Sequence, residues 1–468
     1  MKACGARGGE WRLKVTTTLP LLAALLSSCA FQSPTEDLSI RTPGTWTAAS
    51  SGNEGRISTG WLNDFSDPAL KRSVNDALAF NRSLKAASAR LREAQETTII
   101  ARANQLPQFD VGGSGNVTDG SSFNRTQSYG LNLAASWEPD LWGRLRDLTR
   151  AAGADERAAI EDFRGARLSL AANAAKAYAN LVSSEQEVDL AKFTLESFEK
   201  NLRIIERNYK ATGEGALDIQ FARTNVSSAQ RALEARSLDR ENAARTLEVL
   251  QGKYPGGLSR AASDLPDLPG NVPAGIPADL IERRPDLAAA RARLYASAKR
   301  ADSARKNLLP NFSLTGSSGN AGARFGDLLS VDFLINSISG NVSQFVFDGG
   351  AREAQARGFL AANDRLVNEY AQLALDAFRE VEATLSADRS LAIQEKFLEN
   401  EVAQATLAEK QAERDYAEGV NPNILSVLEA QRRANNARAA IIRLRNQRLQ
   451  NRFDLHLALG GDFRTEAK

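Results

Sequence analysis

The sequence is poor in histidine and cysteine. It has one histidine, His456, and its two cysteines, Cys4 and Cys29, lie within the first 29 of 468 residues. A zinc cluster or a disulfide framework needs several such residues, and acid–base catalysis most often uses a histidine with a partner. We therefore expect no enzyme, no metal site and no cofactor.

Proline is absent from two long stretches. None of the fourteen prolines lies between Pro139 and Pro255 or between Pro310 and Pro422. Because an internal proline breaks a helix, each stretch can hold a helix of about 70 residues, roughly 100 Å long. Within residues 144–211, apolar side chains from Val188 to Tyr209 lie at alternating steps of three and four residues, the seam of a coiled coil. We expect shorter return helices at 216–250 and 423–459, with turns at 213–215 and 419–422.

The N-terminus has the pattern of a secretory signal. Residues 1–14 carry four basic residues and one acidic residue, and an uncharged run follows from Val15 to Leu26. This predicts a signal peptide over residues 1–28. Beyond it, no stretch approaches the roughly 18 apolar residues of a transmembrane helix. Removal of the signal lowers the net charge from +2 to about −1, so no nucleic-acid partner is expected.

The end of the signal, Leu26-Ser-Ser-Cys29, resembles the lipobox of bacterial lipoproteins. The resemblance implies that Cys29 is acylated and becomes the first residue of the mature chain. Ala30 follows in place of the aspartate that retains lipoproteins in the inner membrane, which implies the outer membrane. The alternative is a chance cysteine beside an ordinary cleavage site.

The remaining chain contains a duplication. Pro107 and Pro310 each follow a helical pattern, precede a β-like stretch and lie 203 residues apart. Tyr209 and Tyr416, each before a glycine-containing turn, lie 207 residues apart. A period this long is too large for a solenoid repeat, so it indicates two similar halves.

The β-like stretches alternate apolar and small or polar residues. In 128–137, Tyr129, Leu131, Leu133 and Trp137 alternate with serine, glycine, asparagine and alanine. This alternation is typical of outer-membrane strands, although a half-buried hairpin of a soluble domain alternates in the same way. Membrane barrels begin at eight strands, and open edges do not persist in lipid. If the four strands expected per chain span a membrane, chains must pool them, and three chains give twelve.

Several motifs together resemble the outer membrane factor family, the TolC/OprM-type channels, in its NodT-like lipoprotein branch. They lie in family order over about residues 60–461, and "ERRPDL" is the most specific. The others are the stretch from Trp61 to Leu70, Asn81 before an alanine-rich helix, Gln344 to Gly350, and Leu457 to Gly461.

The resemblance implies a mainly α fold with a small β part. Long antiparallel helical hairpins and four transmembrane strands per chain would form a homotrimer with a 12-helix α-barrel and a 12-strand β-barrel. The implied partners are outer-membrane lipid, a periplasmic adaptor and an inner-membrane pump, usually of the resistance-nodulation-division class. The implied role is a passive conduit that exports small compounds.

The expected divisions of the chain follow from these patterns. After the signal (1–28) they are a lipid-anchored tether (29–60), a helix (61–105), a β-hairpin (106–140), a long α-hairpin (141–250), an equatorial linker (251–280), a second helix (281–308), a second β-hairpin (309–348), a second long α-hairpin (349–460) and a tail (461–468).

A conduit through the envelope must close at rest, so the helix tips should converge. In the family a tyrosine at the second tip bonds to polar neighbours; Tyr416 matches that tyrosine and Asp218 matches an acidic partner. Some members place an arginine where this chain has Asn421, so a charge-assisted bond is lost there. We expect closure to depend more on Tyr416 and on packing. Without the resemblance, core packing would be the better interpretation of Tyr416.

Three acidic residues near the second tip, Glu413, Asp415 and Glu418, suggest an acidic ring that favours cations. The simpler interpretation is that they are solvated charges on the outside of a long helix. Two rival functions also remain open at this stage: a channel for type I protein secretion, with the same architecture, and a lipid-anchored coiled-coil scaffold that opens no pore.

Overall fold

The computed structural model describes residues 43–48, 60–120, 123–213, 215–270, 272–275, 277–330, 334–420 and 423–461. The expected signal peptide and the lipidation residue Cys29 lie outside the described residues, as does Asn421.

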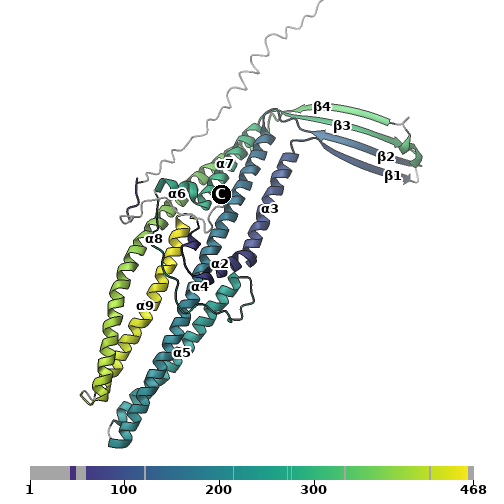
Figure 1. Ribbon diagram of the computed structural model, residues 1–468. Helices are drawn as coiled ribbons and strands as arrows, with labels where there is room; N and C mark the ends of the chain where they lie inside the picture. Colours follow the sequence, from purple (N-terminus) through teal and green to yellow (C-terminus); the bar gives the residue numbers. More distant parts are fainter. Residues whose placement is uncertain are drawn as a thin grey trace, which may run out of the picture. The chain divides into compact units, whose positions relative to one another are not determined.

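Two very long helices dominate the structure (Figure 1). Helix α4 spans Arg144–Thr212 and α8 spans Ala351–Ala417, with 69 and 67 residues. Each is followed by a 35-residue return helix, α5 (Ala216–Leu250) or α9 (Ile424–Ala458). The long helices and return helices expected from the lack of proline are confirmed. Within the described residues, no helix is both long and apolar enough to span a membrane.

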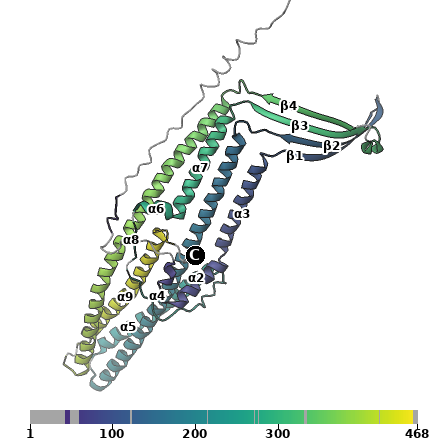
Figure 2. The same ribbon diagram turned by 45° about the horizontal axis from the view of Figure 1, so that its top comes forward.

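Shorter helices precede the strands in each half. They are the 3-10 helix η2 (Trp61–Asn63), α2 (Pro68–Phe80) and α3 (Arg82–Ala103) in the first half, and α6 (Pro277–Arg283) and α7 (Pro285–Lys306) in the second. Figure 2 shows α3, α4, α7 and α8 side by side where they approach the sheet.

The helices expected over 61–105 and 281–308 are each interrupted, the first between α2 and α3 and the second between α6 and α7. Asn81 ends α2 with an extended ψ of 129°, and its side chain accepts a hydrogen bond from Leu84 N and donates one to Leu250 O. Pro285 begins α7, and the residue before a proline avoids the helical region. Asn81 and Arg284 are 203 residues apart, the spacing of the two β-entry prolines, so the break belongs to the duplication.

The two long helices begin alike. Asp140 accepts hydrogen bonds from the backbone N–H groups of Leu145 and Arg146, and Asp348 accepts them from Gly350, Ala351 and Arg352. A carboxylate at a helix N-terminus satisfies N–H groups that have no partner within the helix. The same device therefore starts the long helix of each half, directly after its strands.

The strands form one antiparallel sheet in the order β1-β2-β3-β4. Strand β1 is Gln108–Gly120 and β2 is Phe123–Trp137; β3 is Asn311–Gly322 and β4 is Leu334–Ser343, with the short helix η3 (Phe325–Leu329) between them. Each half supplies one hairpin, and β2 pairs with β3 to join the halves. Within the described residues, the outer edges of β1 and β4 have no strand partner.

The pairing register sorts the side chains onto two unlike faces. Val111 pairs with Leu133, Trp137 with Leu314, and Phe312 with Val342, so apolar side chains from all four strands share one face. The other face is mainly small and polar, apart from Ile335 of β4, which pairs with Gly319. Its members include Asp110, Ser114, Asn132, Ser136, Ser313, Thr315, Ser317, Ser337, Ser339 and Asn341.

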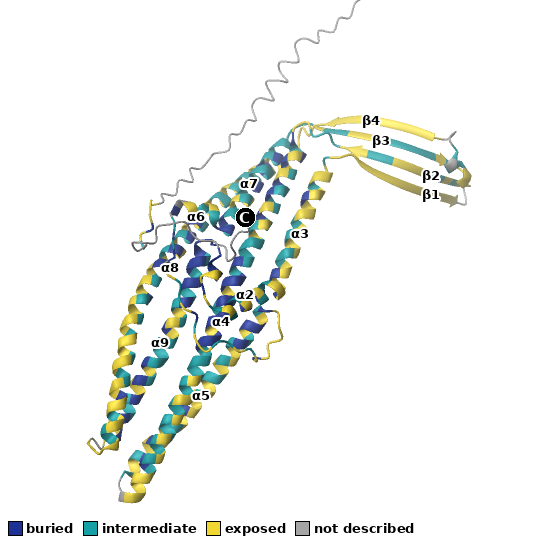
Figure 3. Ribbon diagram, viewed as in Figure 1, coloured by how far each residue is buried: buried dark blue, intermediate teal, exposed yellow. Residues whose placement is uncertain are grey.

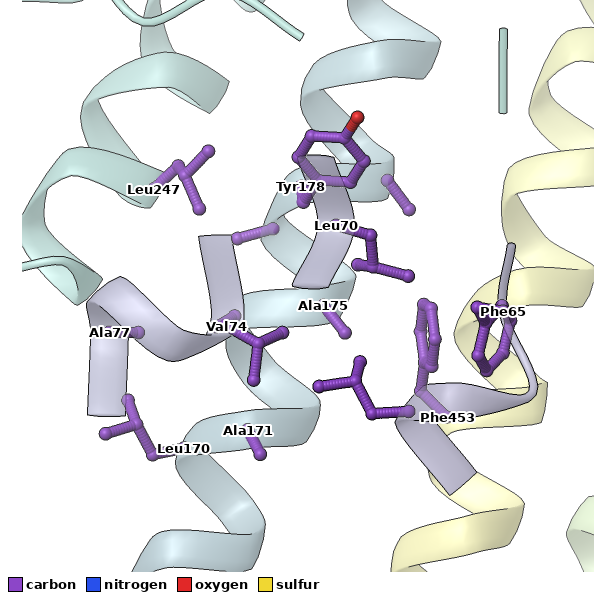
Figure 4. Close-up of a cluster of buried hydrophobic side chains, with 14 of the residues drawn as sticks. Phe65, Leu70, Val74, Ala77, Leu170, Ala171, Ala175, Tyr178, Leu247 and Phe453 are labelled. Atoms are coloured by element: carbon purple, nitrogen blue, oxygen red, sulfur yellow. The ribbon is translucent and has the colours of Figure 1, made fainter. Parts of the chain in front are cut away.

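The largest apolar core lies among the helices, where η2 and α2 pack against α4, α5 and α9. Figure 3 shows buried residues gathered there, whereas the strands are exposed or partly exposed. Figure 4 shows Leu70 and Val74 of α2 beside Ala175 of α4, with Phe65 and Phe453 close together. The rings of Phe65 and Phe453 are 5.1 Å apart, and both residues are fully buried.

A second core joins α8 and α9 to the segment before α7, and it includes a residue of the expected tether. Trp46 is buried, and its indole N–H donates to Ala274 O. The backbone N–H groups of Thr47 and Ala48 donate to the carboxylate of Glu382 on α8. The sequence predicts a lipid-anchored tether over residues 29–60; its described part, 43–48, packs against the helices, because a buried indole and a carboxylate hold it.

Candidate functional site

Both helical hairpins end in short turns that contain glycine. Gly213 and Gly215 have φ angles of 76° and 93° between α4 and α5, and Gly419 has φ 72° after α8. A positive φ is strained for other residues, so these glycines permit the chain to reverse within a few residues. The described residues of both turns, Gly213, Gly215 and Gly419, lie where the sequence analysis places the turns.

An apolar cluster holds the two tips together within one chain. It contains Ile205 of α4, Ile219 of α5, and Ile424 and Val427 of α9, all buried. Tyr416 of α8 packs against the same cluster. The hairpins of the two halves therefore meet near their tips through an apolar contact, and not only at the sheet.

Tyr416 is half-buried at this junction of the two hairpins. Its hydroxyl hydrogen-bonds to the side chain of Asn208 on α4, and it lies close enough to Asp218 on α5 to be affected by its charge. Burial is the main cause that raises the pKa of Tyr416, with a smaller opposing contribution from the bond to Asn208. The hydroxyl stays neutral in the physiological range and can both donate and accept.

Asp218 lies in the first turn of α5, three residues after the N-cap Gly215. A carboxylate there is stabilised by the helix N-terminus whether or not it has another role. The structure thus brings Asp218 close to Tyr416. Asp218 also stabilises the N-terminus of its own helix, α5.

The three acidic residues considered as a ring have different surroundings in the chain. Glu413 accepts a hydrogen bond of 2.7 Å from Gln431 Nε2 on α9. Asp415 accepts one of 2.7 Å from Gln411 on its own helix, and Glu418 is exposed at the end of α8. Glu413 is part of the contact between helices, whereas the other two are not.

Sequence analysis missed a buried polar node at this end of the molecule. Gln431 of α9 is fully buried; its Oε1 accepts from Asn201 Nδ2 at 2.9 Å, and its Nε2 donates to Ser197 Oγ at 3.2 Å and to Glu413 Oε1. The node links α4 of the first hairpin to α8 and α9 of the second. In the sequence, Gln431 lies about two helical turns after Ile424, so it falls on the same buried face of α9. A search for apolar residues does not find it, because glutamine is polar.

A cavity of about 450 Å³ lies beside the node, between α4 and the second hairpin. Its lining combines apolar side chains with charged ones, including Phe193, Lys200, Glu409, Glu413, Tyr416 and Arg438. Glu409 is itself buried and is paired with Arg438 at 2.6 Å. Polar and charged groups thus line the cavity between the two helical hairpins, near their tips.

The lone histidine belongs to the core. His456 is buried and stacks on Trp61 with ring centres 5.3 Å apart. Burial, together with the charge of Arg452, lowers the pKa of His456 to about 3. Within the described residues, no group of three or more His, Cys, Asp or Glu side chains is placed to hold a metal ion.

The comparisons with known proteins decide the family. Residues 73–253 and 276–461 match the family model described as outer membrane efflux protein. The chain belongs to this family. It is 31% identical to the outer membrane protein OprJ of Pseudomonas aeruginosa, with 94% of each chain covered. It is also 30% identical to the toluene efflux pump outer membrane protein TtgI of Pseudomonas putida, over 95% of this chain and 98% of that protein.

Solved structures agree in fold. The open-state outer membrane channel MtrE of Neisseria gonorrhoeae has a TM-score of 0.82 and 25% identity, with 93% of this chain and 99% of that chain covered. The outer-membrane channel OprN has a TM-score of 0.83 and 26% identity, with coverage of 93% and 99%. The expected fold class and outer-membrane location are confirmed, as is the expected function of an outer-membrane component in efflux.

Proposed function

We propose that three copies of this chain form a passive conduit whose sheets close into one barrel in the outer membrane. The pairing register carries this proposal, because it places most of the large apolar side chains of the four strands on one face. That face suits lipid, and the polar face suits a water-filled lumen. The free edges of β1 and β4 cannot remain unpaired in lipid. Pairing between copies satisfies both edges, and twelve strands then exceed the eight-strand minimum.

The conduit carries small compounds out of the cell, and an inner-membrane pump of the resistance-nodulation-division class drives them through a periplasmic adaptor. The relatives whose names state a cargo support small molecules, namely toluene, solvents, antibiotics and pyoverdine. The channel itself contributes a path and no chemical step. A covalent lipid on Cys29 adds a second attachment to the outer membrane.

The tips of the helical hairpins form the closed end of the conduit. Tyr416 fits this role because it joins α8 to Asn208 of α4 within the apolar cluster of the tips. Asp218 assists it from the start of α5, and Asn421, five residues after Tyr416 in the sequence, completes the set. Glu413, Asp415 and Glu418 of three chains together would favour cations at this entrance.

The gate is tested in planar bilayers with the purified trimer. Tyr416→Ala combined with Asp218→Ala should raise the single-channel conductance, because the hydroxyl link and the ring that fills the cluster are both lost. Tyr295→Ala is the control, since this exposed tyrosine lies on α7, away from the tips. An unchanged closed conductance in the double variant would remove both residues from the gate.

The export role is tested in a strain that lacks the gene. Dyes and antibiotics should accumulate in this strain, and the wild-type gene should reverse the accumulation. If a large secreted protein is retained while dye levels stay normal, the type I secretion alternative is correct. A wild-type protein that leaves vesicles impermeable to ions would instead support a non-conducting scaffold.

A further inference from the structure

We propose that Gln431 is a positioning residue of the gate, which fastens the second hairpin to the first in the closed state through its side-chain amide. This inference rests on the proposed gating function and adds a second closure to the one at Tyr416. By its place in α9, Gln431 lies seven residues beyond the start of the helix, about 10 Å from the tip.

The geometry makes Gln431 a link between hairpins and not a local cap. Its Oε1 accepts from Asn201, and its Nε2 is shared between Ser197 on α4 and Glu413 on α8. Two of the three partners therefore belong to the first hairpin. Ser197 and Asn201 are four residues apart on α4, so they present neighbouring polar groups on one face of that helix.

A buried amide is sensitive to displacement in a way that apolar contacts are not. Apolar side chains can exchange one neighbour for another when two helices shift, because dispersion has little directional preference. The amide of Gln431 has no exposed surface, so a shift that breaks its bonds leaves polar groups without partners. The node thus favours one relative position of the hairpins.

The cavity beside the node makes the hydrogen bonds of Gln431 more important for holding the two hairpins together. Glu413, Ser197 and Asn201 all line it, so side-chain packing between α4 and α8 is incomplete at this level. The hydrogen bonds of Gln431 bridge the helices next to that gap. Loss of the node should therefore loosen the closed state more than loss of an apolar residue of similar size.

The contact between Gln431 and Glu413 can be tested by exchanging the two residue types between these positions. Gln431→Glu places a second carboxylate against Glu413, where Nε2 and Oε1 are now 2.7 Å apart. Like charges this close repel. Combining it with Glu413→Gln restores a donor and an acceptor, and the hydroxyl of Ser197 and the amide of Asn201 can both donate to the new carboxylate.

We expect Gln431→Glu to raise the open-to-closed ratio of purified trimers in planar bilayers by between about twofold and a hundredfold. The exchanged pair, Gln431→Glu with Glu413→Gln, should return the ratio to within about twofold of wild type. Glu413→Gln alone keeps an amide oxygen that can still accept from Gln431, so it measures separately the effect of removing the charge of Glu413. A residue that only fills space would show no rescue by the exchange.

A second variant and the yield of trimer distinguish a folding defect from an effect on the gate. Gln431→Leu keeps the volume and removes the bonds, so it should also raise the ratio if Gln431→Glu fails to assemble. If both variants assemble and close like wild type, Gln431 has no role in the gate. If the Tyr416 and Asp218 variant opens the channel while the Gln431 variants do not, only this inference fails; if none of them changes a conducting channel, the proposed gate fails as well.

Discussion

Two adjacent residues of β2 should respond in opposite ways to the same substitution. Leu133 lies on the apolar face, paired with Val111 and Ser318, and Asn132 lies on the polar face, paired with Gly112 and Gly319. Both are near the middle of the pairing of β2 with β3, which the proposed barrel places near the middle of the membrane. If the apolar face meets lipid, Leu133→Arg moves a charge into hydrocarbon, whereas Asn132→Arg moves one into water.

The expected magnitude is large for the trimer. An arginine at the midplane of a membrane barrel costs about 2–4 kcal/mol, and a trimer carries three copies, so the total is roughly 6–12 kcal/mol. Asn132→Arg should cost little, since the lumen is hydrated. Leu133 is 45% exposed in the single chain, so loss of packing within the chain is a minor part of the difference.

The assay is the fraction of chain recovered from outer membranes as assembled trimer. We expect Leu133→Arg to lower this fraction strongly and to lower the temperature at which the trimer dissociates. Asn132→Arg should assemble like wild type and alter conductance instead. If Leu133→Arg assembles normally while Asn132→Arg does not, the assignment of the two faces is refuted.

Three further outcomes concern the helical core and are measured by thermal unfolding in detergent. Phe453→Ala should cost about 3–5 kcal/mol, because it empties a fully buried site against Trp61 and Phe65; a loss under 1 kcal/mol would contradict this packing. Asn81→Ala should cost about 1–2 kcal/mol through the lost cap and the unpaired carbonyl of Leu250, and a neutral result would contradict the cap. Because the folded state holds His456 neutral until about pH 3, its unfolded form gains a proton first as the pH falls below 6.5. Wild type should therefore lose about 2 kcal/mol more than His456→Gln between pH 7.5 and 5, and equal losses would contradict the lowered pKa.

The parts of the fold that could be predicted are those set by local pattern. The absence of proline permits helices as long as α4 and α8, and glycine marks both hairpin turns. The alternation around Leu133 predicts a strand with one apolar face. These features depend on the geometry of one segment and need no knowledge of its neighbours.

The parts that could not be predicted depend on partners distant in sequence. The break at Asn81 is stabilised by Leu250, 169 residues away. Trp46 is buried by residues of the linker and of α8, although its own surroundings in the sequence resemble a tether. Gln431 is a polar residue at a buried position, where its partners on α4 lie 230 and 234 residues away.

The number of chains in the purified particle, measured together with its conductance, tests the central claim most directly. Mass measurement of the detergent-solubilised protein, corrected for bound detergent, should give three chains. The same sample should form ion-conducting pores in planar bilayers. A stable monomer that leaves the bilayers sealed would contradict the account, because four strands with two free edges cannot enclose a pore.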